Sequence, residues 1–124
     1  MPHQLRVHQG AAYLHVHVTG TNDPDAVRGY LREILEICAN QRSTAVLIEE
    51  NLAGPGLKLV DIYSIVSENS EYPRAHLLKV AFVNVNSEHA AGSAKFAETV
   101  ARNRGINVRA FPIVEEARAW LREA

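Results

Sequence analysis

The first twenty residues alternate between apolar and polar side chains. Residues 5–9 and residues 13–19 each show this period of two, and Gly10 lies in the short stretch between them. Alternation on both sides of a glycine-containing turn predicts a β-hairpin with one apolar and one polar face. Three histidines fall on the polar face, and we expect them to be solvated on the outside of the hairpin: His8, His15 and His17.

The pattern then changes to the three- and four-residue spacing of a helix. The apolar positions in this stretch are Val27, Tyr30, Leu31, Ile34, Leu35 and Cys38. Asp23 suits an N-cap and Pro24 suits the first helical position, so we expect an amphipathic helix of roughly four turns. Each fully covered aliphatic side chain contributes about 1.5–3 kcal/mol, so this helix must pack on a partner. The apolar face of the hairpin is the nearest one.

Two continuous apolar runs, at residues 45–48 and 79–85, predict strands buried on both faces of a parallel sheet. Glu49 and Glu50 directly follow the first run, and we expect them to mark where that strand reaches the surface. Residues 52–57 then predict a loop, and residues 67–74 predict a second, polar loop. Between the two loops, a second helix carries an apolar stripe of Leu59, Ile62, Tyr63 and Val66.

The last third of the chain predicts a helix, a short strand and a closing helix. The first of these helices begins at Ser87 or at Ser93 and buries Phe96, Ala97, Val100 and Ala101. Gly105 ends it, because glycine adopts the left-handed conformation without a Cβ penalty. The strand is expected at residues 107–111 and the closing helix at residues 113–122.

Together these elements predict an α/β fold in the order ββαβαβαβα. From the second strand onward each helix joins two strands, which is the arrangement of parallel βαβ crossovers. We therefore expect a mixed, mainly parallel five-stranded sheet with four helices, in which only the first strand is antiparallel. A length of 124 residues suits a single domain, residues 1–124.

Composition narrows the class of protein. The formal charge is −1, and basic residues gather only around Arg102, Arg104 and Arg109, which argues against a nucleic-acid partner. A single cysteine, Cys38, cannot form an internal disulfide and favours a reducing, cytoplasmic setting. We expect neither a secretory signal nor a membrane span, because no stretch approaches about 20 apolar residues.

Three segments resemble a known family: Leu47 to Glu50, Phe96 to Gly105, and Glu116 to Leu121. With the element order and the small size, they resemble the bacterial SpoIIAA-like proteins, which are STAS/SEC14-type domains. The resemblance implies a fold of four right-handed β-α turns and a cytosolic setting. It also implies kinship with protein-protein switching in anti-sigma factor antagonists and with apolar-ligand carriage in SEC14-like domains.

The phosphoswitch of the antagonists is not expected here. The resemblance implies a phosphorylated Ser or Thr at the start of the helix after the third strand, in an Asp-Ser-Ser-Gly-like stretch. Residues 50–56 read ENLAGPG in this chain, and no Ser or Thr follows Glu50 before Ser64.

We therefore expect a non-enzymatic binding or regulatory module without a cofactor. It would engage a protein partner or a small apolar, lipid-like ligand through the loop after Glu50 and the second and third helices. The residues expected to bind are Glu50, Leu52, Leu57, Leu59, Tyr63 and Phe96. Core packing is the default explanation for Leu59, Tyr63 and Phe96, which with Val100 form apolar stripes on the second and third helices.

Three alternatives remain. Glu50 and His89 lie near strand C-termini, where a small hydrolase or a metal-assisted enzyme would place an acid-base pair, although no nucleophile accompanies them. His15 and His17 project from one strand face and would share a metal ion, with His8 as a third ligand, but we see no acidic partner near them.

The hairpin face that bears Tyr13, His15 and His17 would serve as a homodimer interface. We expect His89, like His76, to be a surface loop residue.

Overall fold

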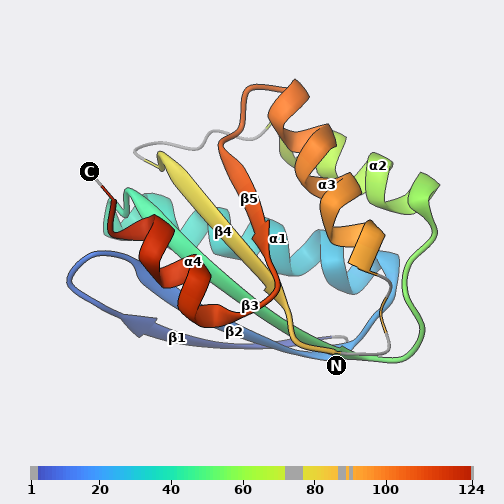
Figure 1. The fold of residues 1–124 in the computed structure, drawn as a ribbon. Coiled ribbons are helices and arrows are strands. Elements are labelled where there is room, and N and C mark those ends of the chain that lie inside the picture. The colour runs from blue at the N-terminus through green and yellow to red at the C-terminus, as the bar shows by residue number, and fades with distance from the viewer. Residues whose placement is uncertain (1–2, 72–76, 87–88, 90, 124) are drawn as a thin grey trace.

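The five strands form one sheet and the four helices cover it, in a computed structural model that describes residues 3–71, 77–86, 89 and 91–123. In chain order the elements are β1 (His3–Gln9), β2 (Leu14–Thr21), α1 (Pro24–Gln41), β3 (Ala45–Ala53), α2 (Leu59–Asn69), β4 (Lys79–Asn84), α3 (Ala91–Asn103), β5 (Val108–Phe111) and α4 (Val114–Leu121). The predicted order ββαβαβαβα is confirmed (Figure 1).

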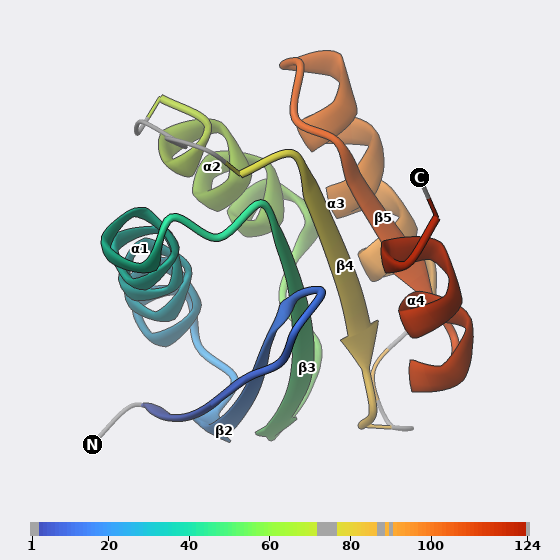
Figure 2. The ribbon, with the colours of Figure 1, turned by 90° about the vertical axis from the view of Figure 1, so that its left-hand side faces the viewer.

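The strands lie side by side in chain order, from β1 to β5. β1 pairs antiparallel with β2, and every later pair is parallel, as predicted. Crossovers of one hand that advance in one direction leave their helices on the same face of a sheet. The helix α4 follows the last strand and packs against β3, β4 and β5 on the other face. Figure 2 shows α1 and α2 on one side of the sheet and α4 on the other.

The start of α1 and the end of α3 have the local structure that the sequence predicts. Asp23 caps α1, since its Oδ1 accepts the backbone N–H of Ala26 at 2.9 Å, and Pro24 is the first helical residue. Gly105 follows α3 with φ +82°, the left-handed conformation predicted for it. Among the residues that the structure describes, no helix is both long enough and apolar enough to cross a membrane.

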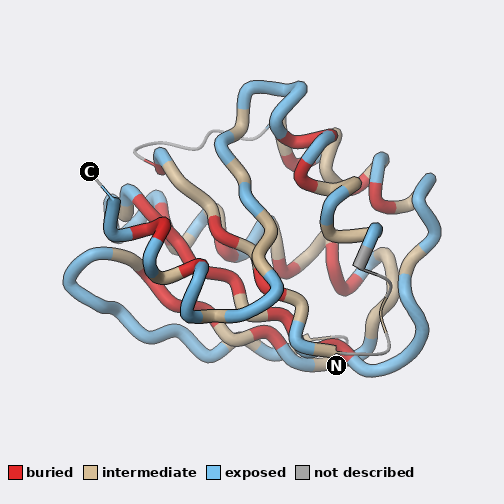
Figure 3. Tube along the Cα trace, viewed as in Figure 1, coloured by how far each residue is buried: buried red, intermediate tan, exposed pale blue. Residues whose placement is uncertain are grey.

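Each face of the sheet has its own apolar core, and the buried segments in Figure 3 follow the central strands. Beneath α1, the alternating residues of the hairpin pack with the apolar stripe of the helix, including Cys38, which is buried as predicted. Beneath α4, Trp120 and Leu121 pack on Leu47, Ala81 and Val83. The alternation of side chains along β3 therefore supplies both cores.

Strand β3 runs further than the apolar run indicated. It continues to Ala53, and Glu50 is only 6% exposed, so the prediction that Glu50 marks the surface is wrong. Alternation places Glu50 on the α1 face, where the hydroxyl of Tyr30 donates a hydrogen bond to it. A buried carboxylate with such a donor is tolerated within a strand, whereas one without a partner is not.

Two other predicted boundaries shift. Helix α2 extends to Asn69, so the polar stretch predicted as a loop from Ser67 begins within the helix. Helix α3 begins at Ala91, between the two predicted starts. Ser87, His76 and residues 72–76 as a whole lie outside the described residues.

Candidate functional site

A cavity of about 180 Å³ lies between the sheet and the helices α1, α2 and α3. Its wall is mainly apolar, and α3 contributes three alanines to it: Ala94, Ala97 and Ala101. The main neighbours of α2 are α1 and α3, with the sheet further away. The alanine side chains of α3 are too small to fill the space between the helices and the sheet, so a cavity remains over β4 and β5.

A buried carboxylate fixes α3 at the edge of the sheet. Glu98 Oε1 accepts the backbone N–H of Ala110 in β5 at 2.7 Å, and Lys95 Nζ donates to Oε2 at 3.0 Å. Burial acts to raise the pKa of Glu98, but these hydrogen bonds and nearby cations outweigh it and lower the pKa. The ionised carboxylate therefore holds the helix on the edge strand through charge-assisted hydrogen bonds.

Glu50 and Tyr30 form one polar group of the cavity wall, and Asn69, whose Oδ1 is buried without a hydrogen-bond partner among the described residues, is another. The Tyr30 hydroxyl donates to Glu50 Oε2, and both side chains are buried. Burial raises the pKa of Glu50, against the opposing effect of the Tyr30 hydrogen bond. The second oxygen, Oε1, has no donor among the residues that the structure describes. An acceptor of this kind on the cavity wall is a natural partner for a ligand donor.

His89 lies at the same end of the cavity as Glu50. Its Nδ1 accepts from Asn84 Nδ2 at 2.9 Å, and its Nε2 lies 2.9 Å from the carbonyl oxygen of Gly54. Because a carbonyl only accepts, the proton is on Nε2 and the ring is the neutral tautomer. Both ring nitrogens are thus engaged, and no hydrogen bond joins His89 to Glu50 within the described ranges. The hydrolase alternative requires His89 to leave one of these bonds.

The loop after β3 closes this end of the cavity. Asn22 donates its backbone N–H to the carbonyl of Ala53 at 2.7 Å and its side-chain amide to the carbonyl of Pro55 at 2.9 Å. The amide of Asn86 donates to the carbonyl of Leu52 at 2.6 Å. These bonds satisfy carbonyls at the end of β3 and in the loop, and they hold the loop against the rest of the fold.

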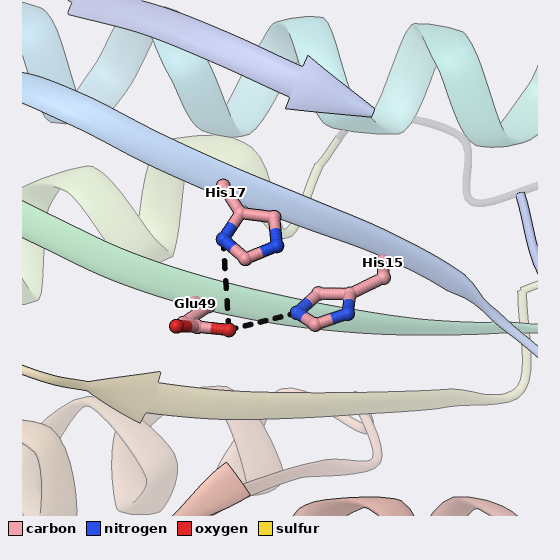
Figure 4. Close-up of side chains that lie close together, drawn as sticks. All are labelled: His15, His17 and Glu49. Carbon is pink, nitrogen blue, oxygen red and sulfur yellow. Dashed lines mark hydrogen bonds and ion pairs between the residues drawn. The ribbon is translucent and has the colours of Figure 1, made fainter. Parts of the chain in front are cut away.

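On the opposite face, His15, His17 and Glu49 form a cluster (Figure 4). His15 is 8% exposed, so the prediction that it is solvated on an outer face is wrong. Parallel pairing places Glu49 opposite His17, which supplies the acidic partner that sequence reasoning missed. Burial lowers the pKa of His15 most, with the charges of His17 and Arg118 adding to this and Glu49 opposing it. His8 pairs with His15 across the hairpin but is exposed and outside the cluster.

Comparison with known proteins identifies the fold. No protein-family model and no curated protein matches the sequence. Among solved structures, the chain is similar to the crystal structure of an anti-sigma factor antagonist from Mycobacterium paratuberculosis, with a TM-score of 0.54 and 12% sequence identity. The match covers 98% of this chain and 95% of that chain. The chain has the SpoIIAA-like (STAS) fold.

Within this STAS fold, the predicted ligand-binding residues are dispersed. Glu50 and Leu57 line the cavity. Leu52 is 0% exposed and belongs to the core beneath α1, while Leu59 and Tyr63 are exposed on α2. Phe96 is partly exposed on α3 and is not part of the wall.

The phase of α2 explains the difference. Its inner face carries Ile62, Ile65 and Asn69, so the apolar stripe expected from Leu59 and Tyr63 is rotated toward solvent. A sequence signal for the cavity exists nevertheless. Alanines at positions 94, 97 and 101 recur with helical spacing, which places small side chains along the inner face of one helix.

Proposed function

We propose that the protein is a binding module whose cavity holds a small apolar molecule carrying one hydrogen-bond donor. The apolar part of the ligand would lie against α2, α3 and the sheet, and its donor would meet Glu50 Oε1. The observation that carries this proposal is an apolar cavity whose wall includes the buried Glu50 side chain, one carboxylate oxygen of which has no donor among the described residues. Ligand sites commonly combine an apolar wall with a few polar groups that fix orientation.

The cavity volume sets the size of the ligand. An apolar cavity of about 150 Å³ is large enough to bind benzene, whereas drug-sized ligands occupy about 300–1,000 Å³. At about 180 Å³, this cavity suits a substituted benzene or a molecule of similar size. The ligand that we propose is therefore more compact than the lipid-like molecule expected from the sequence, and it has no long acyl chain.

A protein partner is the second element of the proposed function, and the outer face of α2 supports it. Leu59, Val60 and Tyr63 are large and exposed on the first turns of this helix. The inner face of the same helix lines the cavity through Ile62 and Ile65. We propose that a partner docks on the outer face and that ligand binding adjusts α2 beneath it, without the phosphorylated serine of anti-sigma factor antagonists.

Titration with phenol and toluene tests the ligand proposal. Phenol carries a donor for Glu50 and toluene does not, so we expect phenol to bind at least about tenfold more tightly. Ala97→Leu fills the cavity and should abolish binding, while Ala119→Leu, an exposed position on α4, should leave it unchanged. Isothermal titration calorimetry measures the affinities, and NMR chemical shifts locate the ligand.

Two results would contradict the ligand proposal. Equal affinities for phenol and toluene would show that Glu50 does not select the ligand. Undiminished binding to a folded Ala97→Leu variant would place the ligand elsewhere, and circular dichroism with a cooperative thermal transition verifies that this variant is folded.

A further inference from the structure

The face of the sheet opposite the cavity carries a second set of groups with ligand chemistry. His15 and His17 lie two residues apart on β2 and so project from the same face, and Glu49 lies beside His17 on β3. Figure 4 shows both imidazoles directed toward the same carboxylate oxygen. We propose that His15, His17 and Glu49 form a binding site for a divalent transition-metal ion such as Zn²⁺.

The donor types fit this class of ion. Zn²⁺ binds neutral imidazole nitrogens and carboxylate oxygens, and two histidines with one glutamate are a known three-ligand set that leaves a position for water. Mg²⁺ and Ca²⁺ prefer sites made of oxygen alone, so two imidazoles argue against them. The proposal is therefore for a borderline transition metal with one open coordination position.

The distances also fit. Glu49 Oε1 lies 2.9 Å from His15 Nε2 and 3.6 Å from His17 Nδ1. Tetrahedral Zn²⁺ with bonds of about 2.0–2.1 Å holds its ligand atoms about 3.3 Å apart, between these two values. The ligand atoms of the three residues all lie within 4.8 Å of one another, so the two imidazoles need only a small approach.

Because β2 and β3 lie inside the sheet, only small side-chain movements are needed for His15, His17 and Glu49 to bind one metal ion. The strands β2 and β3 are hydrogen-bonded neighbours inside the sheet, with β1 and β4 on either side of them. His15 is buried, and its ring stacks on that of His17 with centroids 4.3 Å apart and planes at 23°. His17 is partly exposed, so rotation of its side chain supplies the remaining approach and opens the fourth position to solvent.

The charged groups around the cluster have opposing effects on the binding of a cation. The Glu49 carboxylate attracts a cation, whereas the Arg118 guanidinium of α4 acts on His15 and opposes one. At present one carboxylate oxygen serves two imidazoles, and a metal ion would give each of the three side chains a bond of its own. Binding would also cross-link the hairpin to β3 and raise the thermal stability of the protein.

Cobalt and zinc titrations of untagged protein test this site. We expect one Co²⁺ per chain with the visible absorption of a tetrahedral complex, displacement by Zn²⁺, and a higher melting temperature with Zn²⁺. His17→Gln and Glu49→Gln should each weaken binding by about tenfold or more, because each removes a ligand. These partly exposed positions are preferable to buried His15, and circular dichroism verifies that each variant is folded.

His3→Gln is the matched control. His3 Nε2 lies 3.0 Å from Glu33 Oε1, so this pair reproduces the histidine-glutamate contact without a second histidine. The control should bind Co²⁺ as the unchanged protein does. Equal Co²⁺ affinity in the unchanged protein and in folded His17→Gln and Glu49→Gln variants would overturn the proposal, as would an equal loss in His3→Gln.

Discussion

Replacement of Trp120 with alanine should lower the free energy of unfolding by about 3–5 kcal/mol. Trp120 is buried beneath α4, with its ring centroid 5.6 Å from that of Phe111. Lys79 Nζ lies 5.1 Å from the ring centroid and donates to the Trp120 carbonyl at 2.9 Å. The substitution removes the largest side chain of this core and leaves a cavity that the surrounding strands cannot close. Urea denaturation followed by far-UV circular dichroism measures the change.

A control in the same part of the chain separates burial from helix formation. Ile113 precedes α4 and is exposed, so Ile113→Ala should change the free energy of unfolding by no more than about 0.5 kcal/mol. A loss below about 1 kcal/mol for Trp120→Ala would mean that α4 does not cover the sheet as the structure places it.

Leu52→Ala should cost about 2–5 kcal/mol in the free energy of unfolding, while Leu59→Ala should cost no more than about 0.5 kcal/mol. Both leucines were expected from the sequence to bind a ligand, but Leu52 is 0% exposed in the core and Leu59 is 53% exposed on α2. The two substitutions remove the same atoms, so the difference in burial is the main cause of the expected difference in stability. Guanidinium denaturation of the two variants under identical conditions gives the comparison.

The slope of each denaturation curve must stay unchanged for this comparison to hold, because a changed slope indicates a changed unfolded state. Similar small losses in the two variants would show that Leu52 is accessible, and would favour the sequence-based expectation that it contacts a ligand. Similar large losses would mean instead that the outer face of α2 is covered.

The order and type of the elements could be predicted because they depend on local patterns. The period of two in the hairpin and the helical spacing before Cys38 each report which side of an element is buried. Asp23 acts through its capping side chain, and Pro24 and Gly105 act through their own backbone conformations, so the start of one helix and the end of another were visible in the sequence. Because the three βαβ crossovers all have the same hand, these elements can be arranged in only a few ways.

The two sites depend on contacts between distant segments. Glu50 follows an apolar run and has the sequence signature of a strand end, and only the hydroxyl of Tyr30, 20 residues earlier, explains its burial. Glu49 joins His15 and His17 through the register of β2 with β3, which no local pattern specifies. The phase of α2 was missed because its inner face packs on neighbouring helices, and periodicity alone did not separate Ile65 from Tyr63.

The central claim is that α1, α2 and α3 enclose an apolar cavity over β4 and β5 that a small molecule can enter. A crystal structure under xenon pressure tests it most directly, because xenon binds apolar cavities of this size. We predict xenon density in contact with Ile65, Val80, Ala97 and Ala101, which line the cavity. Side chains packed into that space, with no xenon bound there, would contradict the claim.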